Sequence, residues 1–255
     1  MHAEHPGIRS AVVISFCIPA HDEERLLPAT LASIHGAAGA LSLDYEIIVA
    51  DDASTDATPV IAVAAGARVV PIDRRQIAAA RNAAGSAARG EALFFVDADT
   101  LVHAAALRQA LDLLDSGCVG GGAVPRFEGR VPLWAAVIVE VLVVIFRVTR
   151  FTAGAFMFCT ADAFRRSGGF DEALYGAEEL YFALALKRVG LFRLIGDRVV
   201  TSGRKLRAYS FAEVMHVVFR AGLKGRRGAC TREGLEIWYG PRRDDPADQV
   251  VRNSK

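Results

Sequence analysis

Several widespread signatures of protein chemistry are missing from this chain. No Gly-x-Gly-x-x-Gly follows the first predicted strand and no Gly-x-x-x-x-Gly-Lys-Ser/Thr occurs anywhere, so the phosphate-binding loops of dinucleotide-binding and P-loop proteins are absent. A Gly-x-Ser-x-Gly turn, which would indicate a serine hydrolase, is lacking as well. The cysteines form no Cys-x-x-Cys pair and have no histidines at zinc spacing, which is typical of reduced thiols in a cytosolic protein. They are Cys17, Cys118, Cys159 and Cys230.

An excess of charge of one sign is also lacking. The 255 residues carry a formal net charge of +1, so we expect no nucleic-acid partner. Residues 1–10 contain no apolar run, so a secretory signal is not expected and we predict a cytoplasmic location. With 52% hydrophobic residues the chain can form a sizeable core, in one large domain or two small ones.

Apolar runs and helix-like stretches alternate through the first hundred residues. The pattern predicts strands over 12–18, 45–50, 68–72 and 92–96, and helices over 23–38, 58–65 and 76–88. Such alternation is typical of βαβ units, so we expect an α/β fold with a mostly parallel twisted sheet and helices on both faces.

The rhythm changes after residue 99. We expect helices over 103–116, 177–189 and 211–223, strands over 119–127 and 155–160, and a pair of short strands within 191–200. Residues 131–148 are almost wholly apolar apart from Glu140, but are near the lower length limit for a membrane span. We therefore expect a buried or interfacial helix there. No internal repeat or low-complexity linker is present.

Two carboxylates follow the fourth predicted strand, at Asp97 and Asp99. Ligands of open α/β sheets bind just beyond the carboxyl ends of the strands. Two acids at this spacing repel each other unless a cation or hydrogen-bond donors compensate, and a divalent cation shared with substrate phosphates would do so. The alternative is a solvated turn in which one aspartate caps the next helix.

Acidic or polar clusters also follow the first and second strands, at 19–24 and 51–56. Parallel strands place these ends on one edge of the sheet, so the three clusters should converge on one cleft. Helix capping explains each cluster alone more readily than all three together. Carboxylates that bind a base and ribose, beside a metal that neutralises a diphosphate, indicate a nucleotide-sugar.

Four stretches carry a resemblance to a known family: Ile18-Pro19-Ala20-His21-Asp22-Glu23, Asp51-Asp52-Ala53-Ser54-Thr55-Asp56, Ala80-Arg81-Asn82-Ala83-Ala84-Gly85 and Phe95-Val96-Asp97-Ala98-Asp99. With Gly168-Gly169-Phe170-Asp171-Glu172 and Glu178-Glu179 further on, the chain resembles the family 2 glycosyltransferases of the GT-A fold over about residues 14–205. The resemblance implies an N-terminal tail (1–10), a GT-A domain (11–205) with a nucleotide-binding half (11–100) and an acceptor-side second lobe (101–205), and a basic, apolar helical extension (206–255).

The resemblance also implies roles for individual residues. The nucleoside would be held by Pro19, Glu23, Asp51 and Asp52, with Arg81 as a weaker candidate. Asp99 would ligate Mg²⁺ or Mn²⁺, a Lewis acid for the leaving diphosphate, and Asp97 would face the ribose or sugar as a second metal ligand. Glu178 or Glu179, preferably Glu179, would deprotonate the acceptor hydroxyl in an inverting displacement. The alternative for this acidic pair is a solvated first helical turn.

The chain departs from the family pattern at two places. It has no Gln-x-x-Arg-Trp, so a processive polymer synthase is not expected. Some relatives place a metal-binding histidine after the last strand, where this chain reads Val200-Thr201-Ser202-Gly203-Arg204. Metal ligation from that side is therefore open, and Arg204, Lys205 or Arg207 could bind the diphosphate instead.

Residues 204–227 contain seven basic side chains and one acid, Glu213, around the apolar stretch 211–223. Together with the apolar run 131–148 this pattern favours peripheral contact with the cytoplasmic leaflet and a lipid-linked or membrane-borne acceptor. Both stretches could instead pack on the sheet or on another subunit, as in a homodimer. Two further functions remain open, a nucleotidyltransferase on a similar sheet and a catalytically silent scaffold that binds a membrane or protein.

Overall fold

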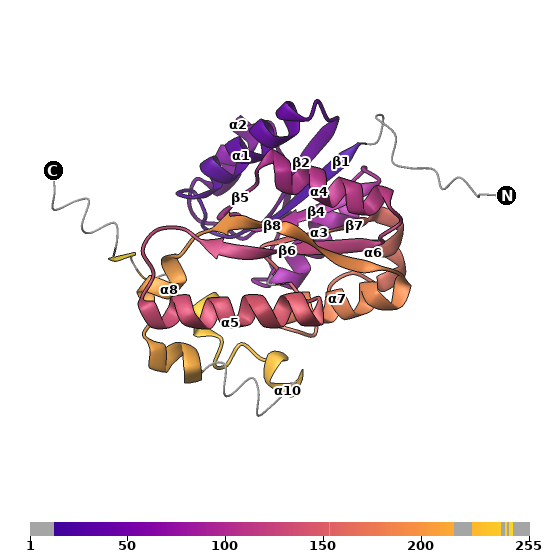
Figure 1. The fold of residues 1–255 in the computed structure, drawn as a ribbon. Helices are drawn as coiled ribbons and strands as arrows, with labels where there is room; N and C mark the ends of the chain where they lie inside the picture. Colours follow the sequence, from indigo (N-terminus) through magenta and orange to yellow (C-terminus); the bar gives the residue numbers. More distant parts are fainter. Residues whose placement is uncertain (1–12, 153, 217–225, 241–242, 244, 247–255) are drawn as a thin grey trace.

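The computed structural model describes residues 13–152, 154–216, 226–240, 243 and 245–246. These residues form an eight-stranded sheet of order β3-β2-β1-β4-β7-β6-β8-β5 with helices on both faces (Figure 1). The strands are β1 (Ile14–Ala20), β2 (Tyr45–Asp52), β3 (Arg68–Ile72), β4 (Ala92–Val96), β5 (Thr100–Leu101), β6 (Gly120–Phe127), β7 (Phe156–Thr160) and β8 (Phe192–Thr201).

The first four strands of that order are parallel. β1 pairs in parallel with β2 and β4, and β2 with β3, whereas β7 runs antiparallel to both β4 and β6. The carboxyl ends of β1, β2 and β4 therefore lie on one edge, with Ala20 opposite Asp51 and Cys17 opposite Phe95. This register brings the three acidic clusters of the sequence together, as predicted.

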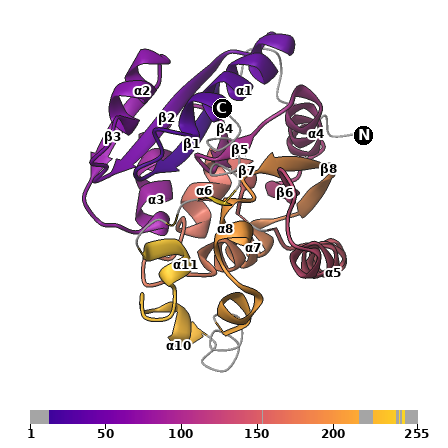
Figure 2. The same cartoon turned by 90° about the vertical axis from the view of Figure 1, so that its left-hand side faces the viewer.

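Helices cover the two faces as two layers. One layer holds α1 (Leu27–Ala40), α2 (Thr58–Ala64) and α4 (Ala104–Asp115), and the other holds α3 (Ile77–Ala87), α6 (Ala161–Ser167) and α7 (Glu178–Val189). Figure 2 shows α1 and α2 on one side of β1–β3 and α3 on the other. Adjacent residues of β4 serve both cores, because Phe94 packs with the first layer and Phe95 with the second.

The second half of the chain differs from its prediction in two elements. Residues 191–200 were expected to form two short strands, but β8 is a single strand. A register shift between Gly122 and Val124 of β6 accommodates extra residues of β8, and the strand continues through the irregularity. The short helix α6 was not predicted. The Thr160 hydroxyl caps its start by accepting a hydrogen bond from the Ala163 amide, and Gly168 ends it at φ 80°.

Residues 131–148, expected as a buried or interfacial helix, form α5 (Leu133–Thr149). The helix is not buried, since Ala135 and Val143 are the only buried residues of α5. No helix among the described residues has both the length and the hydropathy needed to cross a bilayer. The predicted helix 211–223 lies partly outside the described residues, which cover it to residue 216. Short helices follow at α8 (Arg204–Ala208), α10 (Arg226–Ala229) and α11 (Glu236–Tyr239).

Candidate active site

A cavity of about 810 Å³ lies at the edge where β1, β2 and β4 end. Eight of the nine residues predicted for the site line it: Pro19, Glu23, Asp52, Arg81, Asp97, Asp99, Glu178 and Glu179. The ninth, Asp51, is buried at the end of β2 beside Ala20, which does line the cavity. The predicted convergence of the acidic clusters is therefore present.

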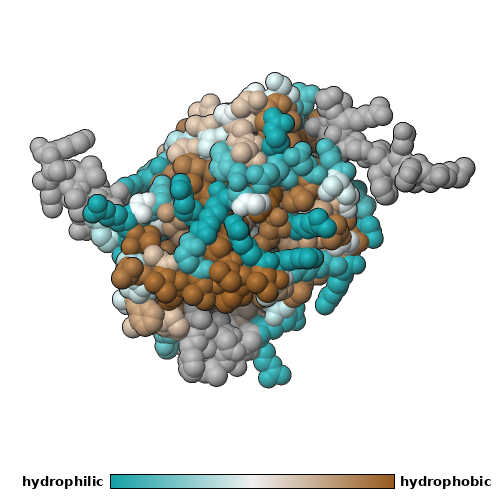
Figure 3. Space-filling view, in the orientation of Figure 1, coloured by the Kyte–Doolittle hydropathy of each residue, from teal (hydrophilic) through white to brown (hydrophobic). Residues whose placement is uncertain are grey.

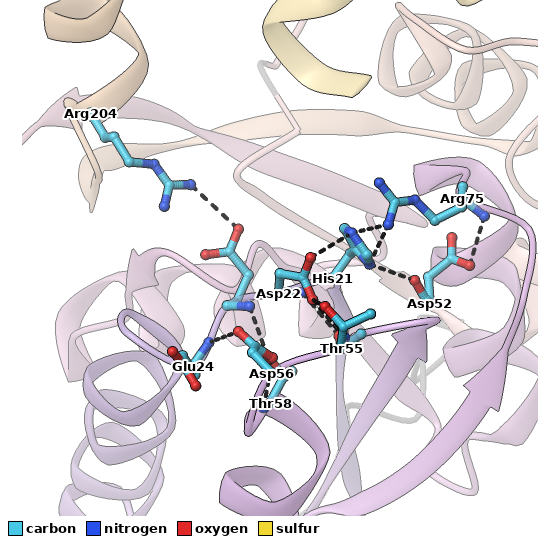
Figure 4. Close-up of polar contacts among 11 residues, drawn as sticks. His21, Asp22, Glu24, Asp52, Thr55, Asp56, Thr58, Arg75 and Arg204 are labelled. Atoms are coloured by element: carbon cyan, nitrogen blue, oxygen red, sulfur yellow. Dashed lines mark hydrogen bonds and ion pairs between the residues drawn. The ribbon is translucent and has the colours of Figure 1, made fainter. Parts of the chain in front are cut away.

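The loops that follow β1 and β2 are tied to each other by hydrogen bonds (Figure 4). Asp22 accepts the backbone N–H of Thr55 at 2.7 Å, and the backbone N–H of Glu23 donates to the Thr58 hydroxyl at 2.7 Å. Asp22 adopts a left-handed conformation with φ 49°, which aspartate tolerates better than most residues. These contacts fix the polar side chains of both loops at the wall of the cavity.

The adjacent aspartates Asp51 and Asp52 have different surroundings. The Asp52 carboxylate accepts the backbone N–H groups of Arg74, Arg75 and Gln76 at 2.8, 2.7 and 2.6 Å. It therefore holds the loop between β3 and α3. Asp51 is also buried, but its Oδ1 accepts no hydrogen bond from any residue that the structure describes. A buried acceptor without a donor is costly, so this atom is suited to an N–H group of a ligand.

Arg81 of α3 connects two of the predicted acids. Its side chain is 4% exposed and donates from Nη2 to Asp97 at 2.8 Å and from Nη1 to Glu178 at 2.9 Å. Burial opposes the charge of the guanidinium, but Asp97 and Glu178 outweigh that effect and raise its pKa above the ordinary value. Gly154, at φ 75°, allows this close approach, because a Cβ there would lie 3.1 Å from Nη2 of Arg81.

The acidic pair at the start of α7 is not a solvated helical turn. Glu178 is 4% exposed and forms a direct ion pair with Arg81. Burial raises the pKa of Glu179 to about 8, the charge of Glu178 adds to the rise, and Arg81 opposes it. A buried glutamate with a raised pKa, next to a second carboxylate that is held by an ion pair, is the arrangement expected of a general base.

Asp99 is the predicted metal ligand. Burial raises its pKa to about 6, nearby Lys205 lowers it, and Asp97 and Glu23 raise it. Its Oδ1 accepts a hydrogen bond from the Thr201 hydroxyl at 3.2 Å, at the end of β8. A half-buried carboxylate of this kind gains from a divalent cation, and Mg²⁺ is commonly held by one or two carboxylates with substrate phosphates and water. The described residues contain no cluster of three or more His, Cys, Asp or Glu able to hold a metal.

The turn at 168–172 is fixed to α3 through Asn82. The Asn82 side chain donates to the Phe170 carbonyl and accepts from the Phe170 amide, both at 2.8 Å. Gln76 adds bonds to the carbonyls of Glu172 at 2.7 Å and Leu174 at 3.0 Å. The motif at 80–85 and the turn therefore form one rigid unit that presents Glu178 and Glu179 to the cavity.

Residues beyond 205, predicted as an extension outside the domain, also line the cavity. Among them are Leu235, Ile237 and Tyr239. The Tyr239 ring meets Tyr175 edge to face at 5.7 Å, and Arg232 lies over both rings while donating to the carbonyls of Arg74 and Arg75. The sequence held no pattern that placed this segment there. The two bonds from Arg232 join it to carbonyls that lie 157 and 158 positions earlier in the chain.

The basic residues named as diphosphate candidates have different positions. Arg204 and Lys205 line the cavity, and Arg204 lies 3.5 Å from Glu23. Figure 4 shows Arg204 extending from its helix toward the loop after β1. Arg207 is instead bound to Asp245 and donates to the Glu128 carbonyl at 2.8 Å. The cavity thus has a basic side next to Asp99, made by Arg204 and Lys205.

Solved structures resemble this fold over most of the chain. A mannosyltransferase from Pyrobaculum calidifontis, solved with GDP-Man and Mn²⁺, has a TM-score of 0.63 at 19% identity over 95% of this chain and 68% of that one. S. aureus TarS (residues 1–349) gives 0.58 at 17% identity over 88% and 70%. Glucosyl-3-phosphoglycerate synthase from Mycobacterium tuberculosis gives 0.56 at 21% identity over 86% and 81%. These similarities confirm the predicted α/β fold of GT-A type.

A curated relative shares a shorter region. A TPR repeat-containing protein of Synechococcus elongatus is 41% identical over 87 residues, which are 34% of this chain and 20% of that protein. The chain therefore matches about a fifth of the length of this relative. The sequence pattern described as glycosyl transferase family 2 matches residues 15–167, more than half of the chain. This chain accordingly belongs to glycosyl transferase family 2.

Proposed function

We propose that this protein is an inverting, metal-dependent, non-processive glycosyltransferase that moves a sugar from a nucleotide-sugar to an acceptor hydroxyl. The observation that carries the proposal is the unit formed by Arg81, Asp97, Glu178 and Glu179 in one cavity. In this unit Arg81 forms ion pairs with Asp97 and Glu178, and burial raises the pKa of Glu179 to about 8. A general base is most effective when its pKa lies near the working pH.

The donor would be bound at the ends of β1 and β2. We assign the nucleoside to Asp51, whose buried Oδ1 can accept an N–H group, with Pro19 and Glu23 beside it. Asp52 would act by holding the loop after β3. The resemblance to structures solved with UDP-Glc and with GDP-Man, both in the presence of Mn²⁺, supports a nucleotide-sugar donor.

The reaction would be a single displacement. Glu179 takes the proton of the acceptor hydroxyl while that oxygen forms a bond to the anomeric carbon. The bond from this carbon to the diphosphate breaks on the opposite face, so the configuration inverts. The ion pairs with Arg81 engage Glu178 and Asp97, which favours Glu179 as the proton acceptor. Asp99, with Asp97 as the second predicted ligand, would hold Mg²⁺ or Mn²⁺, which would neutralise charge on the leaving diphosphate.

Arg204 and Lys205 would contribute to the same neutralisation. They line the cavity on the side of Asp99 where the chain has no histidine. We also propose that the acceptor is lipid-linked or otherwise membrane-borne and that the protein acts at the cytoplasmic face of a membrane. This rests on the seven basic residues within 204–227. Positions 217–225 of that range lie outside the described residues.

The test is a thermal-shift screen of UDP-, GDP- and dTDP-sugars with and without Mn²⁺, followed by donor hydrolysis or transfer with the donor that binds. Glu179→Gln should keep the donor-dependent shift and lose activity by about 10²–10⁴-fold. Asp99→Asn should lose the part of the shift that depends on Mn²⁺. Asp112→Asn, an exposed acid of α4, is the matched control and should behave as wild type. Absence of any donor-dependent shift would favour the silent scaffold.

A further inference from the structure

Helix α5 presents an apolar face outside the cavity that the described part of the chain leaves uncovered. Its stripe of large exposed side chains, called here the α5 stripe, has spacings of four, four, three and four residues, which place its members on one side of a helix. The members are Leu133, Val137, Val141, Val144 and Val148, and Leu142 and Ile145 widen the stripe. Figure 3 shows a continuous hydrophobic band where α5 lies in Figure 1.

The opposite side of α5 is fixed to the body of the protein. Ala135 and Val143 are buried, and α5 packs on β6. Glu140, the one charged residue in the middle of the helix, lies at the edge of the stripe and accepts two hydrogen bonds from Arg198 of β8 at 2.6 and 2.8 Å. These contacts hold α5 along the surface, with its charged residue neutralised and its apolar stripe outward.

Both ends of α5 are basic. Arg126 and Arg130 precede it and Arg147 and Arg150 end it, and all four are exposed. Glu128 is the exposed acid near the first end, so the two ends together carry a charge of about +3. An apolar stripe with arginines at both ends is complementary to a surface that is apolar inside and negative at its rim, which describes an anionic lipid bilayer.

A second copy of this chain would fit the stripe less well. In a parallel or an antiparallel α5 pair, arginines of one copy would face arginines of the other, and such like charges repel. The stripe is also small: a helix of 17 residues is about 25 Å long and about 10 Å wide, roughly 250 Å². A stable protein interface needs about 800 Å² from each partner.

We propose that α5 lies flat in the headgroup region of an anionic membrane, with the α5 stripe toward the acyl chains and the four arginines among the phosphates. The loop before α5 is joined to α8 by the bond from Arg207 to the Glu128 carbonyl, and α8 carries Arg204 and Lys205 of the cavity. Membrane contact through α5 thus sets the basic side of the cavity near the bilayer. The surface is separate from the cavity, so vesicle binding does not depend on which sugar is transferred.

The experiment is flotation of the full chain with vesicles of phosphatidylcholine mixed with phosphatidylglycerol, and with phosphatidylcholine alone. The double substitution Val137→Glu and Val144→Glu removes two members of the stripe, which are 57% and 61% exposed. The matched control is Val60→Glu with Val63→Glu, which are 69% and 63% exposed. Both residues belong to α2, which lies on the opposite side of the sheet from α5 in Figure 1. Circular dichroism and the donor-dependent thermal shift check that both variants fold.

Wild type and the α2 variant should bind the anionic vesicles, more weakly at high salt, and the α5 variant should bind about tenfold or more weakly. Equal loss of binding in both variants, or no binding by wild type, would overturn the proposal. If wild type bound neutral vesicles as tightly as anionic ones, the arginines would have no role in binding, and this result would also contradict the proposal. A wild-type dimer that the α5 substitutions dissociate would identify a second copy as the occupant of the stripe.

Discussion

Replacing Arg81 with methionine would remove a cation that Asp97 and Glu178 share, while keeping much of the side-chain volume. The wild-type side chain is 4% exposed, and its two ion-pair contacts are 2.8 and 2.9 Å long. Glu178, with a side chain 6% exposed, would be left buried beside Glu179 without its guanidinium partner. Removal of one partner from a buried ion pair costs about 3–5 kcal/mol.

Part of that cost reflects the unpaired acid rather than the value of the pair. Arg81→Met combined with Glu178→Gln should therefore recover about 1–3 kcal/mol relative to Arg81→Met, because the uncompensated charge is gone. Arg81→Lys keeps the charge but not the planar fork that reaches two carboxylates at once, so its effect should lie between wild type and Arg81→Met. Urea unfolding followed by circular dichroism gives all these free energies of unfolding.

The same variants should change the proton affinity of Glu179. Arg81 opposes the rise in the Glu179 pKa, so its loss should raise that pKa further and move the activity profile to higher pH. A destabilisation of Arg81→Met below about 1 kcal/mol, or no coupling to Glu178→Gln, would refute the role of Arg81 as the residue that positions the acids. Arg81 would then remain a candidate for direct donor binding.

Three further predictions concern single residues. Activity should rise with pH toward a limit set by the Glu179 pKa of about 8. The free energy of unfolding should fall as pH rises from about 4.5 to about 8, because the folded state binds the Glu179 proton more tightly than the unfolded state does. Glu179→Gln should flatten this dependence on pH. Asp52→Ala should cost roughly 3 kcal/mol in urea unfolding through three lost amide bonds, whereas Asp51→Ala should cost less and abolish the donor-dependent thermal shift. Gly169→Ala should destabilise by about 1–3 kcal/mol, because the residue has φ 72° and its Cβ would lie 2.6 Å from Oδ1 of Asn82.

The sheet edge could be predicted because it depends on local patterns. Four apolar strands separated by helices require parallel pairing, and parallel pairing puts the acids after β1, β2 and β4 on one edge. The ion pairs of Arg81 with Asp97 and Glu178 could not be predicted in the same way. Arg81 lies 16 residues from Asp97 and 97 residues from Glu178, and whether it points inward depends on the rotation of α3 against the sheet.

The same reasoning explains why Asp51 and Asp52 could not be told apart. Adjacent residues of a strand point to opposite faces, but the sequence does not say which face meets the loop after β3. Three backbone amides on Asp52 decide that question, and they come from residues 22–24 positions away. For α5, apolar residues on every side of the helix left no periodicity from which to read the buried face.

The roles of Asn82 and the C-terminal segment show how the cavity depends on contacts between distant parts of the chain. Asn82 fixes the turn that leads to Glu178 and Glu179, while Arg232 joins the segment after residue 226 to the loop that Asp52 holds. The wall near Tyr175 and Tyr239 is therefore connected to both the donor side and the base side. Arg232 binds backbone carbonyls of the loop after β3 and lies over the rings of Tyr175 and Tyr239. Substitutions within 226–240 should therefore alter donor affinity and turnover together, although none of these residues lies in the motifs that carry the family resemblance.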